Sequence, residues 1–149
     1  MKVSKKVVNL KYAKSKEYRK VLKIIEKTER CPFCKENFKY HKKPIFKKEK
    51  GWFITDNSWP YKNTQCHFLI IPKKHKENFI QLSSSDFKSV FKLTNWAIRR
   101  YKIKGGALNL RFGNPLYTGS TVYHLHFHLI VPRVNKKTEK AKVVYFPIG

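Results

Sequence analysis

Hydrophobic residues recur along two segments of this chain with the spacing of amphipathic helices. Between residues 16 and 28 they fall largely on one helical stripe, and over about residues 86–102 they recur at i+3, i+4 and i+7. Ser84 or Ser85 is expected to cap the start of the second segment, and a Gly-Gly pair stops it. The pattern therefore predicts a shorter helix near the N-terminus and a longer helix in the second half of the chain.

Short apolar runs of strand length lie outside these helices. The predicted strands are residues 52–56, 67–72, 107–112, 123–132 as the longest, and 143–147 as a further candidate. The segments 57–65 and 113–120 are rich in Asn, Gly, Pro and Ser, which is typical of loops. The fold class that follows is α+β, an antiparallel sheet of about five strands with one long helix and one or two shorter helices.

Three histidines alternate with apolar residues in the stretch HLHFHLIVPR, which runs from His124 to Arg133. Alternate residues of a strand share one face, so His124, His126 and His128 are expected to form a row with Cα atoms about 6.6–7 Å apart. A single histidine on an apolar strand usually has a structural role. A row of three is costly to align unless an anionic group or a metal faces it, so the row predicts a functional site.

Two of the three cysteines, Cys31 and Cys34, form a C-x-x-C motif. So few cysteines argue against a disulfide scaffold and for metal binding or redox use in a reducing compartment. A thioredoxin-like redox pair is disfavoured because the βαβ context is missing, while spare thiols remain an alternative. A tetrahedral Zn²⁺ takes four Cys or His ligands, and His75 and His124 fit as partners, with His41 as another candidate.

The chain is strongly basic, with 34 Lys and Arg against 9 Asp and Glu and a formal net charge of +25. Such an excess indicates a polyanionic partner, and nucleic acid is possible from the net charge alone, although lysines that only solvate the surface are the alternative. No apolar stretch approaches the roughly 18 residues of a membrane span, and the basic N-terminus lacks the apolar core of a secretory signal. We therefore expect an intracellular protein, cytoplasmic or associated with nucleic acid, that is not secreted and has no membrane partner.

The histidine row and the segments around it resemble the histidine triad (HIT) superfamily, whose signature is His-φ-His-φ-His-φ-φ with φ apolar. The stretch His67–His75 is similar to the upstream strand of that family, Asp56–Pro60 to its ribose-binding loop, and residues 113–124 to the loop that leads into the triad. These segments follow one another in the family's order over about residues 31–134. The resemblance implies a HIT-like fold for residues 31–149, preceded by a basic N-terminal arm and helix at residues 1–30.

The resemblance also implies a nucleotide hydrolase or nucleotidyltransferase that cleaves a nucleoside monophosphate from a phosphate-linked leaving group. In such enzymes the middle histidine, here His126, attacks the α-phosphate to form a nucleotidyl-histidine; His128 would contact the phosphate and His124 would support the nucleophile. The implied nucleotide-binding residues are Asn57 for the ribose, and Asn114, Gly119, Ser120 and Thr121 for the phosphate. For the two asparagines, turn formation alone is the alternative. Ser120 stands where many family members carry Gln.

By the same resemblance, a structural zinc ion would be bound by Cys31, Cys34, His75 and His124, and would hold the N-terminal segment to the sheet. His67 is expected to pack near the active site. The substrate would be a nucleotide, with 5′-adenylated DNA, a diadenosine polyphosphate and a phosphoramidate as open alternatives, and a homodimer is implied. A hypothesis of another class is a non-catalytic nucleic-acid-binding subunit built on a HIT scaffold. The intact triad favours the enzyme.

Overall fold

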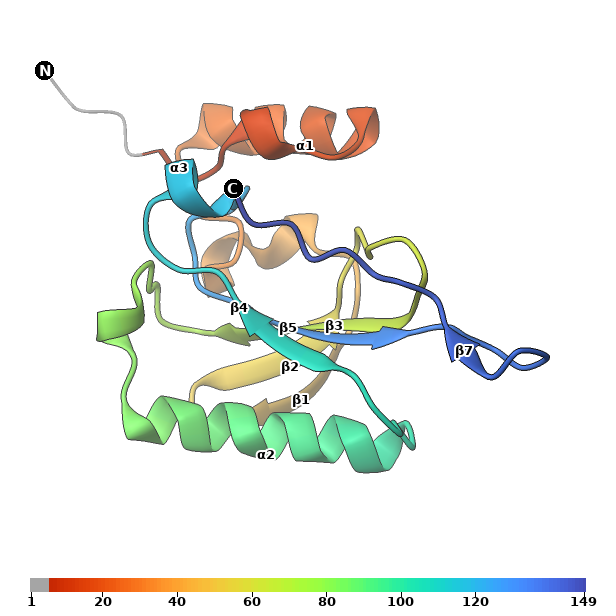
Figure 1. Ribbon diagram of the computed structural model, residues 1–149. Coiled ribbons are helices and arrows are strands. Elements are labelled where there is room, and N and C mark those ends of the chain that lie inside the picture. Colours follow the sequence, from red (N-terminus) through yellow and green to blue (C-terminus); the bar gives the residue numbers. More distant parts are fainter. Residues whose placement is uncertain (1–5) are drawn as a thin grey trace, which may run out of the picture.

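A five-stranded antiparallel sheet in the order β1-β2-β3-β5-β4 forms the centre of the fold (Figure 1). The computed structural model describes residues 6–149, apart from the side chains of residues 35–37. The strands are β1 (Ile45–Glu49), β2 (Trp52–Asp56), β3 (Thr64–Pro72), β4 (Ala107–Leu110), β5 (Phe127–Pro132), β6 (Val134–Asn135) and β7 (Lys140–Ala141), the last two forming a separate small hairpin. The α-helices are α1 (Lys16–Thr28), α2 (Ser84–Arg100) and α3 (Pro115–Thr118). Short 3-10 helices are η1 (Leu10–Tyr12), η2 (Lys35–Tyr40) and η3 (Phe79–Gln81). The predicted α+β class is confirmed.

The two faces of the sheet have different partners because strand side chains alternate. On one face, Trp52 and Ile54 of β2, with Phe68 and Ile70 of β3, pack against α2 in the main hydrophobic core. The opposite face carries a smaller apolar cluster and the histidine residues of β3 and β5. Helices α1 and α2 accordingly lie on opposite sides of the sheet in Figure 1. The face opposite α2 is therefore the one that can hold a site.

Helix α2 begins at Ser84, two residues earlier than predicted, and its N-cap is Ser83 rather than Ser84 or Ser85. The reason is a capping box, in which Ser83 and Asp86 each accept a hydrogen bond from the other's backbone N–H. Asp86 also accepts hydrogen bonds from Trp52 Nε1 (2.8 Å) and Lys76 Nζ (2.6 Å). Trp52 of β2 and Lys76, which follows β3, thus hold Asp86 in place. Ser83 is therefore the N-cap among the three adjacent serines.

The strand predicted for residues 123–132 is shorter than expected, because β5 begins only at Phe127. The residues before it take backbone partners elsewhere: Tyr123 N–H donates to Val7 O (3.0 Å) and Leu125 N–H donates to Lys76 O (2.7 Å). His124 and His126 therefore precede the strand and only His128 lies within it, so the prediction of one strand-borne row is wrong. The longest strand of the sheet is β3.

Other departures involve the edges of the sheet. Strand β1 was not predicted; it is a largely exposed edge strand rich in lysine, so it lacks the apolar alternation that marks half-buried strands. The predicted strand at residues 143–147 does not form, and this segment instead runs across the molecule, held by Asn63 Nδ2–H donating to Val143 O (2.9 Å).

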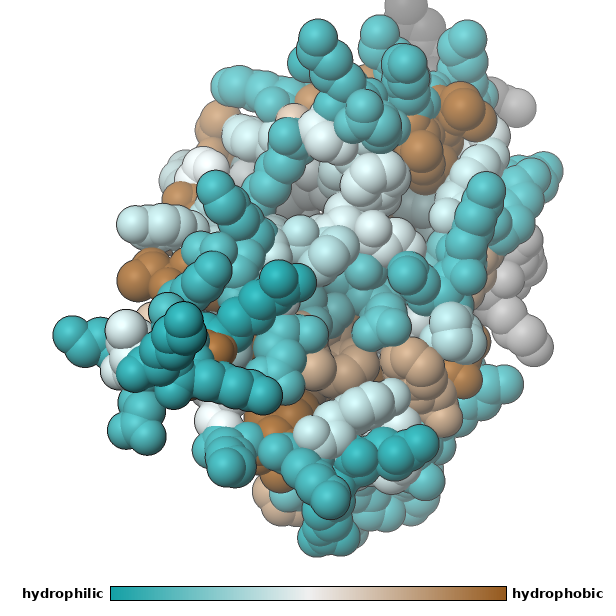
Figure 2. Space-filling view, turned by 90° about the vertical axis from the view of Figure 1, so that its right-hand side faces the viewer, coloured by the Kyte–Doolittle hydropathy of each residue, from teal (hydrophilic) through white to brown (hydrophobic). Residues whose placement is uncertain are grey.

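Within the described range, no helix is long and apolar enough to span a membrane. Hydrophilic side chains dominate the face shown in Figure 2.

The N-terminal segment packs onto the rest of the chain from residue 7 onward. Val7 and Val8 are buried in one cluster with Leu22 and Ile25 of α1 and with Val122 in the loop before the triad. Val8 and Val122 form an isolated antiparallel bridge. This packing places α1 against the loop that leads to the histidines. The first five residues of the expected basic arm lie outside the described part of the chain.

Candidate active site and metal centre

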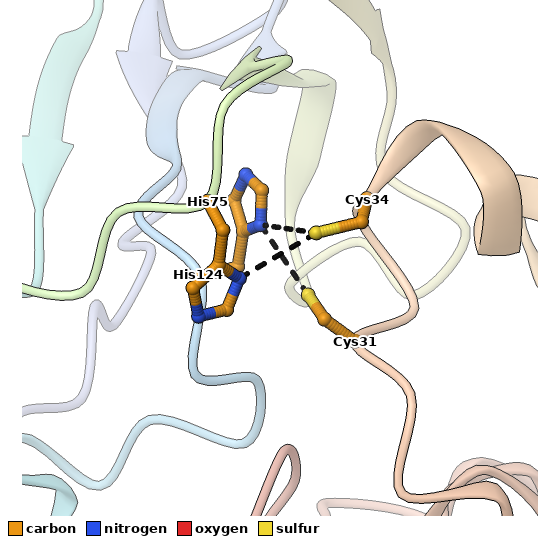
Figure 3. A group of neighbouring side chains, drawn as sticks. All are labelled: Cys31, Cys34, His75 and His124. Carbon is orange, nitrogen blue, oxygen red and sulfur yellow. Dashed lines mark hydrogen bonds between the residues drawn. The ribbon is translucent and has the colours of Figure 1, made fainter.

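Cys31, Cys34, His75 and His124 converge in a single cluster, as predicted (Figure 3). Their ligand atoms all lie within 4.8 Å of one another. Nδ1 of His124 is 3.3 Å from Cys31 Sγ and 3.8 Å from Cys34 Sγ, and Nδ1 of His75 is 3.5 Å from Cys34 Sγ. A tetrahedral Zn²⁺ bound by two thiolates and two imidazoles would separate these atoms by about 3.3–3.8 Å. The four residues therefore fit zinc.

The protonation of both imidazoles suits metal binding. His124 Nε2–H donates to the backbone oxygen of Pro72 (2.8 Å), and His75 Nε2–H donates to Glu77 Oε1 (2.7 Å). Each hydrogen bond leaves an unprotonated Nδ1 on the side of the cysteines, which is the usual outer support of a metal-bound histidine. Burial raises the pKa of the Cys31 thiol, so a nearby cation is needed to make it a thiolate. His41, the other candidate ligand, lies elsewhere and contacts Thr55 (2.7 Å).

A cavity of about 680 Å³ lies between α1 and the sheet, and both His126 and His128 line it. Its walls include apolar side chains of α1, aromatic rings from three loops, and the predicted residues Asn57, Gly119, Ser120 and Thr121. This volume falls in the range of small-molecule sites, which are concave, mostly apolar and furnished with a few polar groups. The cavity is therefore large enough for a nucleotide.

The surroundings of His126 fix the orientation and the tautomer of its ring. Its ring lies between Phe33 (centroids 5.1 Å apart) and His128 (4.7 Å). Its Nδ1–H donates to the backbone oxygen of His124 (2.8 Å), which leaves Nε2 unprotonated. Burial, assisted by the positive charge of Arg111, lowers its pKa to about 4, so the imidazole is neutral near pH 7. A neutral imidazole with a free nitrogen is the form that attacks phosphorus.

His128 is positioned as a hydrogen-bond donor by a relay through His67. The backbone N–H of Tyr61 donates to His67 Nδ1 (3.1 Å), so the proton of His67 is on Nε2 and is donated to His128 Nδ1 (2.9 Å). His128 therefore carries its own proton on Nε2. That nitrogen is buried and, among the described residues, has no hydrogen-bond partner. A buried donor without a partner is costly, and a phosphate oxygen would satisfy it.

Replacing His67 tests this relay. Leucine at position 67 fills a similar volume but removes the donor, so His128 can take the other tautomer. We expect kcat to fall about 10- to 100-fold, as when a hydrogen bond that orients a functional imidazole is lost. His67→Gln is the matched variant, because its amide can accept from Tyr61 N–H and donate to His128. It is expected to retain most of the activity. Equal losses in both variants, measured by steady-state kinetics on correctly folded protein, would contradict the relay.

Asn57 lies beside this relay. Its Oδ1 accepts a hydrogen bond from the Trp59 backbone N–H (2.9 Å), and its Nδ2–H can donate to His67 Nδ1 (3.4 Å). The predicted role in binding and the alternative role in turn formation are thus compatible, since the same side chain shapes the turn and lines the cavity.

The phosphate-binding residues implied by the resemblance divide between two cavities. Gly119, Ser120 and Thr121 line the large cavity, and Thr121 Oγ1 forms a hydrogen bond with Tyr18 Oη of α1 (2.8 Å). Asn114 is exposed, accepts the Leu116 backbone N–H (2.9 Å) as the N-cap of α3, and lines a neighbouring cavity of about 330 Å³. Its predicted contact with phosphate stays a prediction.

Sequence reasoning missed two cavity residues, Lys14 and Arg111. Arg111 has a weak signal, since it interrupts the apolar run 107–112 that was predicted as a strand. Lys14 has none, because nothing in the sequence distinguishes it among so many basic residues. Helix α1 was predicted correctly, but its place over the cavity depends on packing.

A family model, related sequences and solved structures show which proteins this chain is similar to. Residues 30–144 match a family model described as "Scavenger mRNA decapping enzyme C-term binding". An uncharacterized HIT-like protein of Chlamydia muridarum is 33% identical over 89 residues, which cover 58% of this chain and 68% of that protein. Among solved structures, a HIT family hydrolase from Clostridium thermocellum superposes with a TM-score of 0.54 at 27% identity, covering 72% of this chain and 94% of that one.

A zinc-bound histidine triad family protein from Mycobacterium smegmatis also shares the fold, with a TM-score of 0.54, 20% identity, and coverage of 74% of this chain and 79% of that one. The fold, the three histidines and the matched family model all indicate the same superfamily. The chain therefore belongs to the histidine triad superfamily, in the group that the decapping-enzyme model describes.

Proposed function

We propose that the protein is a nucleotide hydrolase or nucleotidyltransferase that acts through a nucleotidyl intermediate on His126. The observation that carries the proposal is the pair of complementary tautomers: His126 has a free Nε2, and the adjacent His128 has an unpartnered Nε2–H. A nucleophile and a donor for a phosphate oxygen thus line one cavity.

In the proposed reaction, Nε2 of His126 attacks the α-phosphorus and a P–N bond forms. The bond from phosphorus to the leaving group breaks, and its electron pair departs with that group. Water then attacks the same phosphorus and breaks the P–N bond. The oxygen of the water stays on the nucleoside monophosphate, one proton passes to solvent, and His126 returns to its neutral form with Nδ1–H still donated to His124 O.

The proposed metal centre would support this chemistry through His124, which belongs to the cluster and contacts the nucleophile His126. Cys31, Cys34, His75 and His124 would hold zinc, which would supply a structural cross-link between the N-terminal segment and the triad. The backbone oxygen of His124 accepts the proton of His126 Nδ1–H (2.8 Å). A restrained His124 therefore keeps the nucleophile in one tautomer and one orientation.

The test is release of nucleoside monophosphate from three substrates: diadenosine triphosphate, adenosine 5′-phosphoramidate and 5′-adenylated DNA, each at low and moderate salt. Release from at least one substrate, with labelled nucleotide trapped on His126 after rapid quenching, is the expected result. Steep loss of activity on adenylated DNA with salt would indicate that the basic surface contacts the strand. If nothing turns over while DNA or RNA still binds, the protein is a non-catalytic nucleic-acid-binding subunit.

We also propose a homodimer. An exposed aromatic group surrounds Phe79, whose ring centroid lies 5.7 Å from that of Phe87 and 5.3 Å from that of Phe112. The exposed Phe91 extends this group along α2. Strand β4 is an edge of the sheet, free to meet a second copy. Phe91→Lys is expected to shift the mass in light scattering from dimer to monomer, whereas Ile24→Lys on exposed α1 should not. A wild-type protein that is monomeric at high concentration would exclude the dimer.

A further inference from the structure

Two cations meet at Tyr61 on one wall of the cavity. The ammonium of Lys14 lies 3.8 Å from the centroid of the Tyr61 ring, and Arg111 Nη2–H donates to Tyr61 Oη (2.7 Å). Lys14 is an exposed residue just before α1, and Arg111 follows β4 and is partly buried. Segments distant in the sequence thus bring two positive charges onto one aromatic ring.

Arg111 is held before any ligand arrives. Its Nε–H donates to the backbone oxygen of Pro147 (2.8 Å), and its guanidinium lies 4.1 Å from the centroid of the Phe146 ring. A guanidinium has five N–H donors in a rigid fork, and the contacts to Tyr61 and Pro147 use two of them. The remaining donors suit a phosphate, which such a fork can bind in bidentate fashion.

Neither cation has an acidic partner among the side chains that the structure describes. The ion pairs found there are His75–Glu77, Lys76–Asp86 and Lys92–Glu49. Partial burial of the Lys14 ammonium, together with the charge of Arg111, lowers the pKa of Lys14 to about 8. Two uncompensated positive charges at the mouth of a cavity are unfavourable on their own, and an anion placed between them would relieve the repulsion.

Ring contacts connect the two cations to the triad histidines. Phe33 contacts His126 (5.1 Å), His126 contacts His128 (4.7 Å), and His128 stacks on Tyr61 (5.8 Å, 14° between planes). The reacting phosphate, placed at the two histidines, has an apolar wall on the side of Phe33 and the cations on the side of Tyr61. A base prefers the apolar side, so the cations face the other substituent of the phosphorus.

We propose that Lys14 and Arg111 form a specificity site for an anionic leaving group, so that the preferred substrates carry a phosphate beyond the α-phosphate. This inference rests on the proposed function. Neither residue belongs to the segments that resemble the HIT motifs. When the P–O bond to such a leaving group breaks, its electron pair stays on a phosphate oxygen, and the two cations stabilise that charge without a proton transfer. An amine leaving group must instead gain a proton and departs uncharged, so it carries no negative charge for the two cations to stabilise.

The test compares two leaving groups on the same nucleotide: ADP, released from diadenosine triphosphate, and ammonia, released from adenosine 5′-phosphoramidate. The measured quantity is the ratio of the two kcat/KM values in wild type, Arg111→Gln and Lys14→Gln. Each substitution is expected to lower this ratio about 10- to 100-fold, the effect of losing a charge-assisted contact. Arg111→Lys should lower it less. Lys20→Gln removes the same charge from an exposed position of α1 outside the cavity, and should leave the ratio unchanged.

The outcomes separate this inference from the proposed function. If both substrates lose activity equally in Arg111→Gln and Lys14→Gln, the cations bind the transferred phosphate and the inference is wrong. A fall of the same size in the kcat/KM ratio of Lys20→Gln would also overturn the inference, because the positive charge of the whole protein would then explain the substrate preference. If wild type turns over neither substrate, the proposed function fails for both of them. The inference about Lys14 and Arg111 is then tested by calorimetry with inorganic pyrophosphate. Equal binding to wild type and Arg111→Gln would show that this inference is wrong as well.

Discussion

Replacement of His126 by alanine is expected to abolish turnover while the protein still folds and binds nucleotide. Removal of a covalent nucleophile costs on the order of 10⁴-fold or more in kcat. The two neighbouring imidazoles cannot substitute, because His128 presents a proton at its free nitrogen and both nitrogens of His67 are already hydrogen-bonded. Steady-state kinetics and calorimetric binding of the nucleoside monophosphate product measure the two effects separately.

His126→Gln is the companion to that variant, since an amide fills much of the imidazole volume without being nucleophilic. Both variants should bind product within a few-fold of wild type and unfold within a few degrees of it. The covalent mechanism would be refuted if either variant kept more than about a tenth of the wild-type kcat. A variant that loses binding and activity together would instead show that His126 holds the ligand.

The second large effect is expected on removal of zinc. The protein should be isolated with one equivalent of zinc, and chelation, or the double substitution Cys31→Ala and Cys34→Ala, should destabilise it strongly. Structural zinc sites contribute about 10 kcal/mol or more of binding free energy at neutral pH, so we expect the unfolding midpoint to fall by at least about 10 °C. Metal content by elemental analysis and thermal unfolding by circular dichroism measure this.

Cys66→Ala provides the control for thiol loss. Cys66 is a partly buried residue of β3 outside the metal cluster, so its substitution should leave zinc content unchanged and lower stability only slightly. Activity should fall with zinc even below the unfolding temperature, because His124 both belongs to the cluster and accepts the hydrogen bond of His126. Full activity in the zinc-free protein would separate the two sites and contradict this coupling.

The residues of the proposed metal and phosphate sites could be named from the sequence because their identity is itself the signal. Cys31 and Cys34 occur as a pair, His124, His126 and His128 alternate, and few other patterns of Cys and His are compatible with a metal beside a phosphate site. The structure brings the four predicted ligands together and places the two remaining triad histidines in one cavity. The metal cluster and the cavity are linked by one hydrogen bond, from His126 Nδ1–H in the cavity to the backbone oxygen of His124 in the cluster.

The local conformation of the triad was not predictable in the same way. Alternation of His and apolar residues predicted a strand from residue 123, but the backbone N–H groups of Tyr123 and Leu125 bond to Val7 and Lys76. Those partners come from segments remote in sequence. A period-two pattern cannot distinguish a strand in the sheet from an extended segment bound to another part of the chain.

The α+β class, the two main helices, and the candidate roles of the three histidines and the cysteine pair follow from the amino-acid sequence alone, because periodicity and ligand type are properties of short stretches. Tertiary structure decided the protonation of each histidine, since a tautomer depends on partners such as Pro72 O and Tyr61 N–H that lie far along the chain. It also decided which of the many basic residues face the cavity. Lys14 and Arg111 acquire their role only when α1 and β4 bring them to the same tyrosine ring.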